Sequence, residues 1–237
     1  QRQMCIRDRR LTPQEVPQFS QYAARSLNAM ALQSGTTVQD LIERFQKEPV
    51  TREAMRSRLE KIDDPEMLDM VMRQLRREVM TTLIVRDLTA HADFHEVVGT
   101  VTALAEETVS AAVRVHSRKL AQRFGVPVGV SGEPQDLLVV GMGKLGGEEL
   151  KVSSDIDLVF VYDEGGETQA IGEFASARRQ VTNHEFFDRL ARRVIASINE
   201  IDGTGFVFRV DMRLRPFGDS GPLVISSAML EEYLYSE

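Results

Sequence analysis

The spacing between a glycine turn and a pair of aspartates constrains this 237-residue chain more than any other feature. The stretch "LLVVGMGKLGGEELKVSSDIDLVFVYDE" covers residues 137–164, and Gly141, Gly143 and Gly146 follow an apolar run in the G-x-G-x-x-G pattern of dinucleotide-binding folds. Such folds need a helix of about ten residues or more between their first two strands. At most about two helical turns fit between Gly143 and Asp157, so the pattern disfavours a nicotinamide site.

The two aspartates after this turn point to a different chemistry. On a strand, Asp155 and Asp157 project from the same face about 6.5 to 7 Å apart, where their charges repel unless a cation or an arginine lies between them. Oxygen ligands at this spacing suit Mg²⁺ or Mn²⁺. For an isolated D-x-D pair, however, a turn acid followed by a solvated strand edge is the simpler interpretation.

A later segment of the chain favours the metal site over a solvated strand edge. The alternation over residues 206–215 predicts a strand with Asp211 and its arginines on one face and apolar residues on the other. If this strand neighbours the first, Asp211 joins Asp155 and Asp157 as a third metal ligand, and the three arginines around it, Arg209, Arg213 and Arg215, suit the binding of phosphate. This is the two-metal arrangement for displacement at phosphorus. An amphipathic surface strand without function produces the same pattern.

The first half of the chain has a helical pattern. Apolar residues recur every three or four positions after Asp64-Pro65, an acid and a proline typical of a helix start. We therefore expect a helical bundle region over residues 11–125 and a catalytic domain over residues 126–237 that is cut short at its C-terminal end. The expected helices cover residues 13–30, 37–47, 51–61, 65–83, 96–121 and 184–200, and the expected strands cover residues 137–140, 158–162 and 206–215.

Composition narrows the class of protein. The formal net charge of −7 argues against nucleic acid as a partner, because a phosphate backbone would repel the chain. A single cysteine predicts no disulfide framework and a reducing, cytoplasmic location. No apolar run reaches the 18 to 20 or so residues that span a bilayer, so we expect no membrane association. The polar segment 1–10 is interpreted as a translation artefact or a disordered terminus.

Two long motifs carry a resemblance to a known family. "GMGKLGGEELKVSSDIDLVFVY" and "FVFRVDMRLRPFGDSGPLV" resemble the bifunctional glutamine synthetase adenylyltransferase/adenylyl-removing enzymes, within the nucleotidyltransferase superfamily that includes DNA polymerase β. The upstream segment "LRREVMTTLIVRDLTA" is also similar. The resemblance implies an α+β fold with a polymerase β-like mixed sheet and helices, preceded by the helical region. The motifs are most similar to the first, adenylyl-removing half of that family.

The resemblance also implies roles for particular residues. Asp155, Asp157 and Asp211 would be the catalytic metal ligands for Mg²⁺, with Mn²⁺ as a substitute. The residues that would hold phosphate or nucleotide are Gly143, Lys144, Gly146, Gly147, Ser154, Arg213 and Arg215. The loop differs from the common family form at Glu148 and Lys151, which leaves its specificity open.

The expected reaction is removal of AMP from an adenylylated tyrosine of glutamine synthetase. The attacking group would be inorganic phosphate and the product ADP, in control of nitrogen assimilation, and a PII-type nitrogen signalling protein is a further expected partner. Two alternatives stay open: adenylylation of the same protein from ATP, and a catalytically silent module that binds glutamine synthetase or a signalling protein. The presence of all three aspartates weighs against the silent module.

Overall fold

The computed structural model describes residues 10–203 and 205–236, and these form an α+β fold. The interpretation of residues 1–10 lies outside the described residues, except for Arg10. The helices are α1 (Val16–Phe19), α2 (Gln21–Ser34), α3 (Val38–Lys47), α4 (Arg52–Leu59), α5 (Pro65–Leu88), α6 (Phe94–Phe124), α7 (Gly143–Gly146), α8 (Asn183–Asn199) and α9 (Ser227–Ser236), with short 3₁₀ turns η2 (Gly172–Phe174) and η3 (Gly218–Ser220). The strands are β1 (Val126–Pro127), β2 (Leu138–Met142), β3 (Ile156–Tyr162), β4 (Thr168–Gln169), β5 (Val210–Asp211) and β6 (Val224–Ser226).

The two long helices begin at side-chain caps that satisfy otherwise unpaired amide groups. Asp64 accepts a hydrogen bond from the Met67 amide at 2.9 Å at the start of α5, which confirms the helix start at Asp64-Pro65. At the start of α6, Asp93 accepts from the Glu96 amide at 2.8 Å. In the described part of the chain, no helix is both long enough and apolar enough to cross a bilayer.

The central sheet is built around β3. On one edge β3 pairs with β2 in antiparallel orientation, and on the other it pairs with β5 and β6, both parallel. The register places Asp157 opposite Asp211 on β5 and Phe160 opposite Val224 on β6. Since directly paired residues project from the same face, this register decides which side chains meet.

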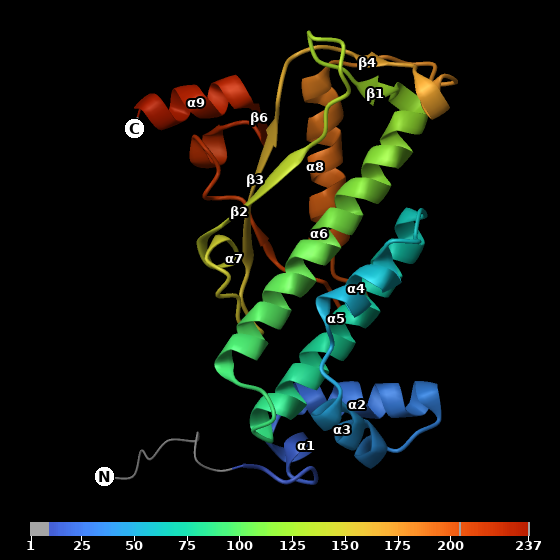
Figure 1. Ribbon diagram of the computed structural model, residues 1–237, viewed down its shortest axis with the longest axis vertical. Coiled ribbons are helices and arrows are strands. Elements are labelled where there is room, and N and C mark those ends of the chain that lie inside the picture. The colour runs from blue at the N-terminus through green and yellow to red at the C-terminus, as the bar shows by residue number, and fades with distance from the viewer. Residues whose placement is uncertain (1–9, 204, 237) are drawn as a thin grey trace.

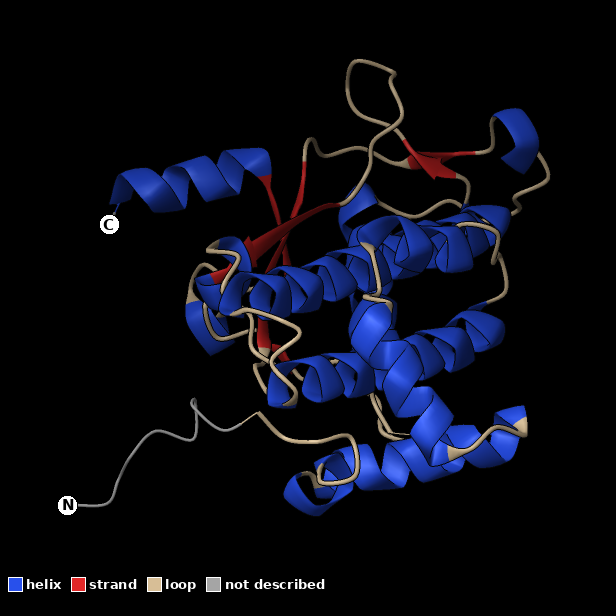
Figure 2. Cartoon of the chain, turned by 60° about the horizontal axis from the view of Figure 1, so that its bottom comes forward, coloured by secondary structure: helices blue, strands red, loops and turns tan. Residues whose placement is uncertain are grey.

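One continuous core joins the helices to the sheet. Figure 1 shows α6 running diagonally between the sheet on one side and α4 and α5 on the other, with α8 next to α6 and to the sheet, and Figure 2 shows how much of the molecule is helical. Buried side chains of α5, α6, α8 and β3 belong to one cluster. A smaller cluster joins α1, α2 and α3 to the end of α5. The predicted boundary between residues 125 and 126 stays a prediction, since the apolar core is shared across it.

The predicted strand over residues 206–215 is wrong in extent. Only Val210 and Asp211 form a strand, and Leu214, expected in the core, is 51% exposed. The reason is local: the Asp211 carboxylate accepts a hydrogen bond from the Arg213 amide at 2.9 Å, which is typical of a turn started by aspartate. The chain then folds into successive turns up to Gly218, and the facing pattern expected for its arginines no longer holds.

Candidate active site

The two faces of β3 have different surroundings. Ile156, Leu158, Phe160 and Tyr162 are buried in the main core, as the alternation predicts. On the opposite face, Val159 and Val161 pack with Ile225 of β6 and with Leu230 of α9. Asp157 lies on this second face, near the start of β3.

Asp157 and Asp211 lie side by side on that face. They are register partners on neighbouring parallel strands, which places them about 4.8 Å apart in the pairing direction. Met142, the last residue of β2, pairs with Asp157 from the other side. Asp155 precedes the strand by one residue, and its negative charge contributes to the electrostatic environment of Asp157. The structure therefore places Asp211 beside Asp157, and Asp155 near enough for its charge to act on Asp157.

Gly143 leaves room for the Asp157 carboxylate. Its φ of +53° lies in the left-handed region that favours glycine, and a Cβ at this position would lie 2.7 Å from Asp157 Oδ2. Gly146 packs as closely on β2, because a Cβ there would lie 2.6 Å from the Gly141 carbonyl oxygen. The glycine turn is thus pressed against the strands that carry the carboxylates.

The carboxylates differ in their electrostatics. Burial raises the pKa of Asp157, the negative charges of Asp211 and Asp155 raise it further, and Arg213 and Lys144 partly offset the effect. The pKa of Asp211 is lowered, because Arg213 donates side-chain and backbone hydrogen bonds to its carboxylate. The ionised form of Asp157 is therefore the one that most lacks a compensating cation.

Two of the three carboxylates are engaged by arginines. Arg213 Nε donates to both oxygens of Asp211, at 3.0 and 2.9 Å, and its Nη2 adds a contact of 2.5 Å. Arg209 Nε lies 2.5 Å from Asp155 Oδ1, and its Nη2 donates to the Ser153 carbonyl at 3.2 Å. Both guanidinium groups are mostly exposed, so solvent screens their attraction to the carboxylates, although the Asp211 carboxylate itself is largely covered.

The chemistry of these side chains suits a hard divalent cation. Carboxylates supply the oxygen ligands that Mg²⁺ and Mn²⁺ prefer. Burial is the main cause of the raised pKa of Asp157, and the charges of Asp211 and Asp155, which raise it further, are ones that a cation would neutralise. Over residues 10–203 and 205–236, no three acidic, histidine or cysteine side chains are arranged as a ready-made metal cluster. Asp155 and Asp211 are instead turned to their arginines, so metal binding requires that these pairs rearrange.

The predicted phosphate-binding residues have mixed surroundings. Lys144 is close enough for its charge to lower the pKa of Asp157. The Ser154 hydroxyl accepts a hydrogen bond from the Lys151 amide at 3.1 Å and closes the turn before Asp155. The Gly147 amide donates to the Gly143 carbonyl at 3.0 Å and is used within the turn. Arg215 Nη1 donates to the Met212 carbonyl at 2.6 Å, which holds Arg215 against its own turn.

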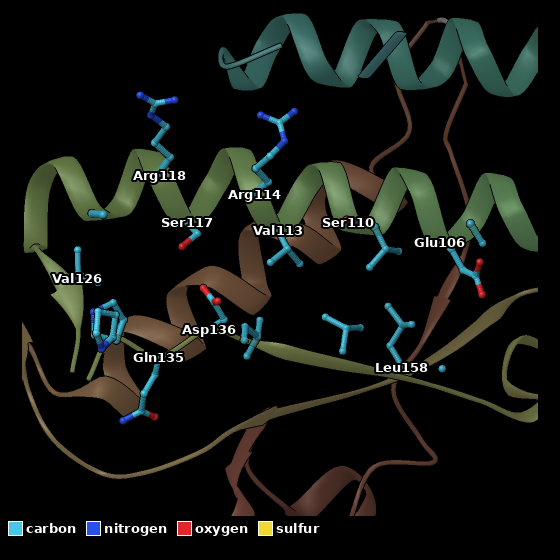
Figure 3. A pocket seen from close by; sticks show the side chains of 18 of the residues that line it. Glu106, Ser110, Val113, Arg114, Ser117, Arg118, Val126, Gln135, Asp136 and Leu158 are labelled. Carbon is cyan, nitrogen blue, oxygen red and sulfur yellow. The ribbon is translucent and has the colours of Figure 1, made fainter. Parts of the chain in front are cut away.

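A pocket of about 780 Å³ lies on the other side of the sheet, between α6 and β2. Figure 3 shows Val113 and Ser117 of α6 pointing toward β2, while Arg114 and Arg118 point away from it. Leu158, which lines this pocket, is on the face opposite Asp157. This pocket is therefore separate from the carboxylates, although Leu145 and Gly146 of the glycine turn form part of its wall.

The sequence grouped Arg209 with the arginines around Asp211 and did not indicate its contact with Asp155, which the structure shows. Its position two residues before Asp211 was the available signal, since β5 pairs beside the start of β3. The Arg209 carbonyl accepts a hydrogen bond from the Ile156 amide at 2.9 Å, which fixes the two segments side by side.

An α+β chain with paired aspartates on adjacent parallel strands, a D-x-D motif and a glycine turn against them belongs to the class of nucleotidyltransferases. More particularly, the chain belongs to the glutamate-ammonia ligase adenylyltransferase family, whose model matches residues 14–237.

Curated relatives agree with this assignment. The chain is 48% identical over 221 residues to the bifunctional glutamine synthetase adenylyltransferase/adenylyl-removing enzyme of Chromobacterium violaceum, covering 93% of this chain and 24% of the relative. It is 46% identical over 224 residues to the protein of the same name from Burkholderia mallei, covering 92% and 23%. For the Ralstonia nicotianae protein the identity is 52% over 172 residues, covering 72% and 17%. The chain spans about a quarter or less of the length of these relatives.

Proposed function

We propose that this chain removes AMP from an adenylylated tyrosine of glutamine synthetase by phosphorolysis. The observation that carries the proposal is the pairing of Asp157 with Asp211 on one sheet face, where Arg213 donates hydrogen bonds to both carboxylate oxygens of Asp211. The names of the relatives supply the protein substrate and include both attachment and removal of the adenylyl group. A PII-type nitrogen signalling protein is the proposed regulator.

The reaction displaces one oxygen from phosphorus by another. An oxygen of hydrogen phosphate attacks the phosphorus of the AMP group, a new P–O–P bond forms, and the bond from phosphorus to the tyrosine oxygen breaks. The phosphate proton passes to the tyrosine oxygen, and ADP leaves with the new terminal phosphate. Because hydrogen phosphate is already an anion at neutral pH, the main requirement is cations that overcome its repulsion from the AMP phosphate.

Different residues bind the metal, the AMP phosphate and the incoming phosphate. Asp155, Asp157 and Asp211 hold Mg²⁺, or Mn²⁺ in its place. When bound, the metal neutralises the charge that develops on the phosphorus oxygens. Gly143, Gly146 and Gly147 let the AMP phosphate approach the backbone, with Lys144 and Ser154 beside it. Arg213 leaves the Asp211 carboxylate and binds the incoming phosphate. Arg215, on the next turn, contributes a second positive charge to this phosphate.

The test follows the fate of labelled phosphate. Adenylylated glutamine synthetase is mixed with the chain, Mg²⁺ and ¹⁸O-labelled inorganic phosphate, and the nucleotide product is analysed by mass spectrometry. We expect ADP with label in its terminal phosphate, at a rate that rises with phosphate concentration. Arg213→Ala should weaken the use of phosphate more than the binding of adenylylated protein.

Three outcomes contradict the proposal. Release of AMP without phosphate indicates hydrolysis. Incorporation of AMP from ATP into unmodified glutamine synthetase indicates the adenylylating reaction. Binding of glutamine synthetase with no change in its mass under either condition indicates a silent module.

A further inference from the structure

Three arginines gather on one phenyl ring far from the carboxylates. The guanidinium carbons of Arg123, Arg189 and Arg179 lie 5.1, 5.3 and 6.0 Å from the centre of the Phe124 ring. They come from the end of α6, from α8 and from the loop that precedes α8. We call Arg123, Arg179 and Arg189 the Phe124 arginine cluster.

The charges of this cluster are not balanced within the described chain. Arg189 Nη2 lies 2.5 Å from Glu185 Oε1, and its Nε is buried without a hydrogen-bond partner among the described residues. The side chains of Arg123 and Arg179 make no ion pair or hydrogen bond with any described residue. Three arginines and one glutamate leave a formal charge of +2 around the ring, in a chain whose net charge is −7.

Stacking on the ring stabilises the individual guanidinium groups but does not remove their mutual repulsion. A cation–π contact at an exposed site contributes only about 0.5 to 1 kcal/mol. Like charges around one ring repel one another, and an anion bound among them would reverse the sign of that interaction. The cluster therefore has the composition of an anion-binding site, with an aromatic ring that orients the planar groups.

We propose that the Phe124 arginine cluster binds a phosphate dianion, as free phosphate or as the terminal phosphate of a nucleotide. The guanidinium fork matches phosphate oxygens with two parallel hydrogen bonds. A terminal phosphate carries about −1.5 to −2 charges at pH 7, which matches the formal +2 of the cluster better than a single carboxylate does.

This site is separate from the proposed active site. Asp157 lies near the start of β3 and Tyr162 at its end, so the strand alone separates them by about 16 Å. The Tyr162 ring stacks on Phe187, two residues before Arg189, with 5.2 Å between the ring centres. Figure 1 shows the end of α6 and the start of α8 together at one end of the molecule, and α7 near the middle.

The test is calorimetric titration of the chain with inorganic phosphate, and separately with ADP, at constant ionic strength and with EDTA present. Acetate serves as the monoanion comparison. We expect phosphate to bind, acetate to bind more weakly, and Arg123→Ala or Arg179→Ala to weaken phosphate binding about tenfold, as expected for the loss of one charge-assisted contact. If ADP binding is weakened by the same variants, the site takes the terminal phosphate of a nucleotide; if only phosphate binding is weakened, it takes the free ion.

The matched control is Arg178→Ala, which removes an exposed arginine next to Arg179 that does not contact the ring. We expect this variant to bind phosphate within twofold of the unmodified chain. Melting in chloride buffer checks the fold of each variant, and Arg179 is exposed, so its removal should leave the melting temperature unchanged.

Several results would overturn the proposal. These are an absence of phosphate binding, full binding by Arg179→Ala, or an equal loss in Arg178→Ala, which would indicate general charge attraction only. Loss of binding in Arg213→Ala with full binding in the cluster variants would place the phosphate at the carboxylates instead. The phosphorolysis assay is independent, because it reports ADP formation and not phosphate binding without metal.

Discussion

Gly143 controls the space around the Asp157 carboxylate. Because its Cβ would lie 2.7 Å from Asp157 Oδ2 and its φ is +53°, Gly143→Ala must move either the turn or the carboxylate. We expect adenylyl removal to fall more than tenfold and the free energy of unfolding to fall by about 1 to 2 kcal/mol. Steady-state assays and urea unfolding measure the two effects.

The control for this variant is Gly99→Ala. Gly99 lies within α6, and a Cβ there meets no atom within 4 Å. Alanine in a helix interior is favoured over glycine by about 0.5 to 1 kcal/mol, so this variant should be at least as stable as the unmodified chain. Equal activity of Gly143→Ala and Gly99→Ala would show that the close approach at Gly143 has no functional consequence.

Asp157 is expected to be required for activity and, in the absence of metal, to lower the stability of the folded chain. Its pKa is raised by burial and by two neighbouring carboxylates, so Asp157→Asn removes an unfavourable charge with little change in volume. Without metal, the melting temperature should stay equal or rise, whereas adenylyl removal should fall by at least about 100-fold. Asp163→Asn, at an exposed position just after β3, is the control. If Asp157→Asn unfolds the chain, the carboxylate is structural and the proposed site is wrong.

At the scale of elements, the contact between α6 and α8 contains a histidine that must stay neutral. Burial, and then the nearby charge of Arg193, lowers the pKa of His116 to about 4. Both ring nitrogens of His116 lack hydrogen-bond partners among the described residues. An unfolded histidine has a pKa of about 6.5, so the unfolded chain takes up the proton first as the pH falls.

This histidine predicts a defined pH dependence of stability. Its contribution is fully present above about pH 6.5 and is lost as the pH falls to about 4, for a total of up to about 3 kcal/mol. Urea unfolding at a series of pH values should therefore give a smaller slope over this range for His116→Leu than for the unmodified chain. Parallel pH profiles for the two proteins would contradict the prediction.

At the scale of the whole molecule, the shared core predicts that helices and sheet unfold together. Phe160 is fully buried at the centre of β3, in the same cluster as residues of α5 and α6. Phe160→Ala should lower the free energy of unfolding by about 3 to 5 kcal/mol. Circular dichroism at 222 nm, which reports mainly the helices, should show one transition shifted to lower temperature.

The control at this scale is Val130→Ala, since Val130 is 88% exposed and its truncation should leave the transition in place. A helical transition that Phe160→Ala leaves unchanged, beside a second that it shifts, would mean that residues 11–125 fold as a separate unit. That outcome would support the boundary predicted from the sequence.

Local sequence determined most of the helices, although the helix expected over residues 13–30 divides at Ser20 into α1 and α2, because Ser20 is extended and caps α2. Helix starts depend on a cap and the first turn, and apolar stripes depend on spacings of three and four, so Asp64, Pro65 and the pattern after them were sufficient for α5. The glycine turn and the D-x-D pair were also recognisable, because the room between them excludes a crossover helix. The family resemblance then singled out Asp155, Asp157 and Asp211, and its family assignment was confirmed.

Only the tertiary structure decided how distant segments meet. Alternation predicted a strand over residues 206–215, but a hydrogen bond from the Arg213 amide to Asp211 ends β5 after two residues. The register that sets Asp211 beside Asp157 depends on packing between segments far apart in the chain. The arginine partners of the carboxylates and the three arginines around Phe124 also depend on this packing. The reason is that local periodicity specifies which face of a segment is apolar but not which other segments will pack against that face.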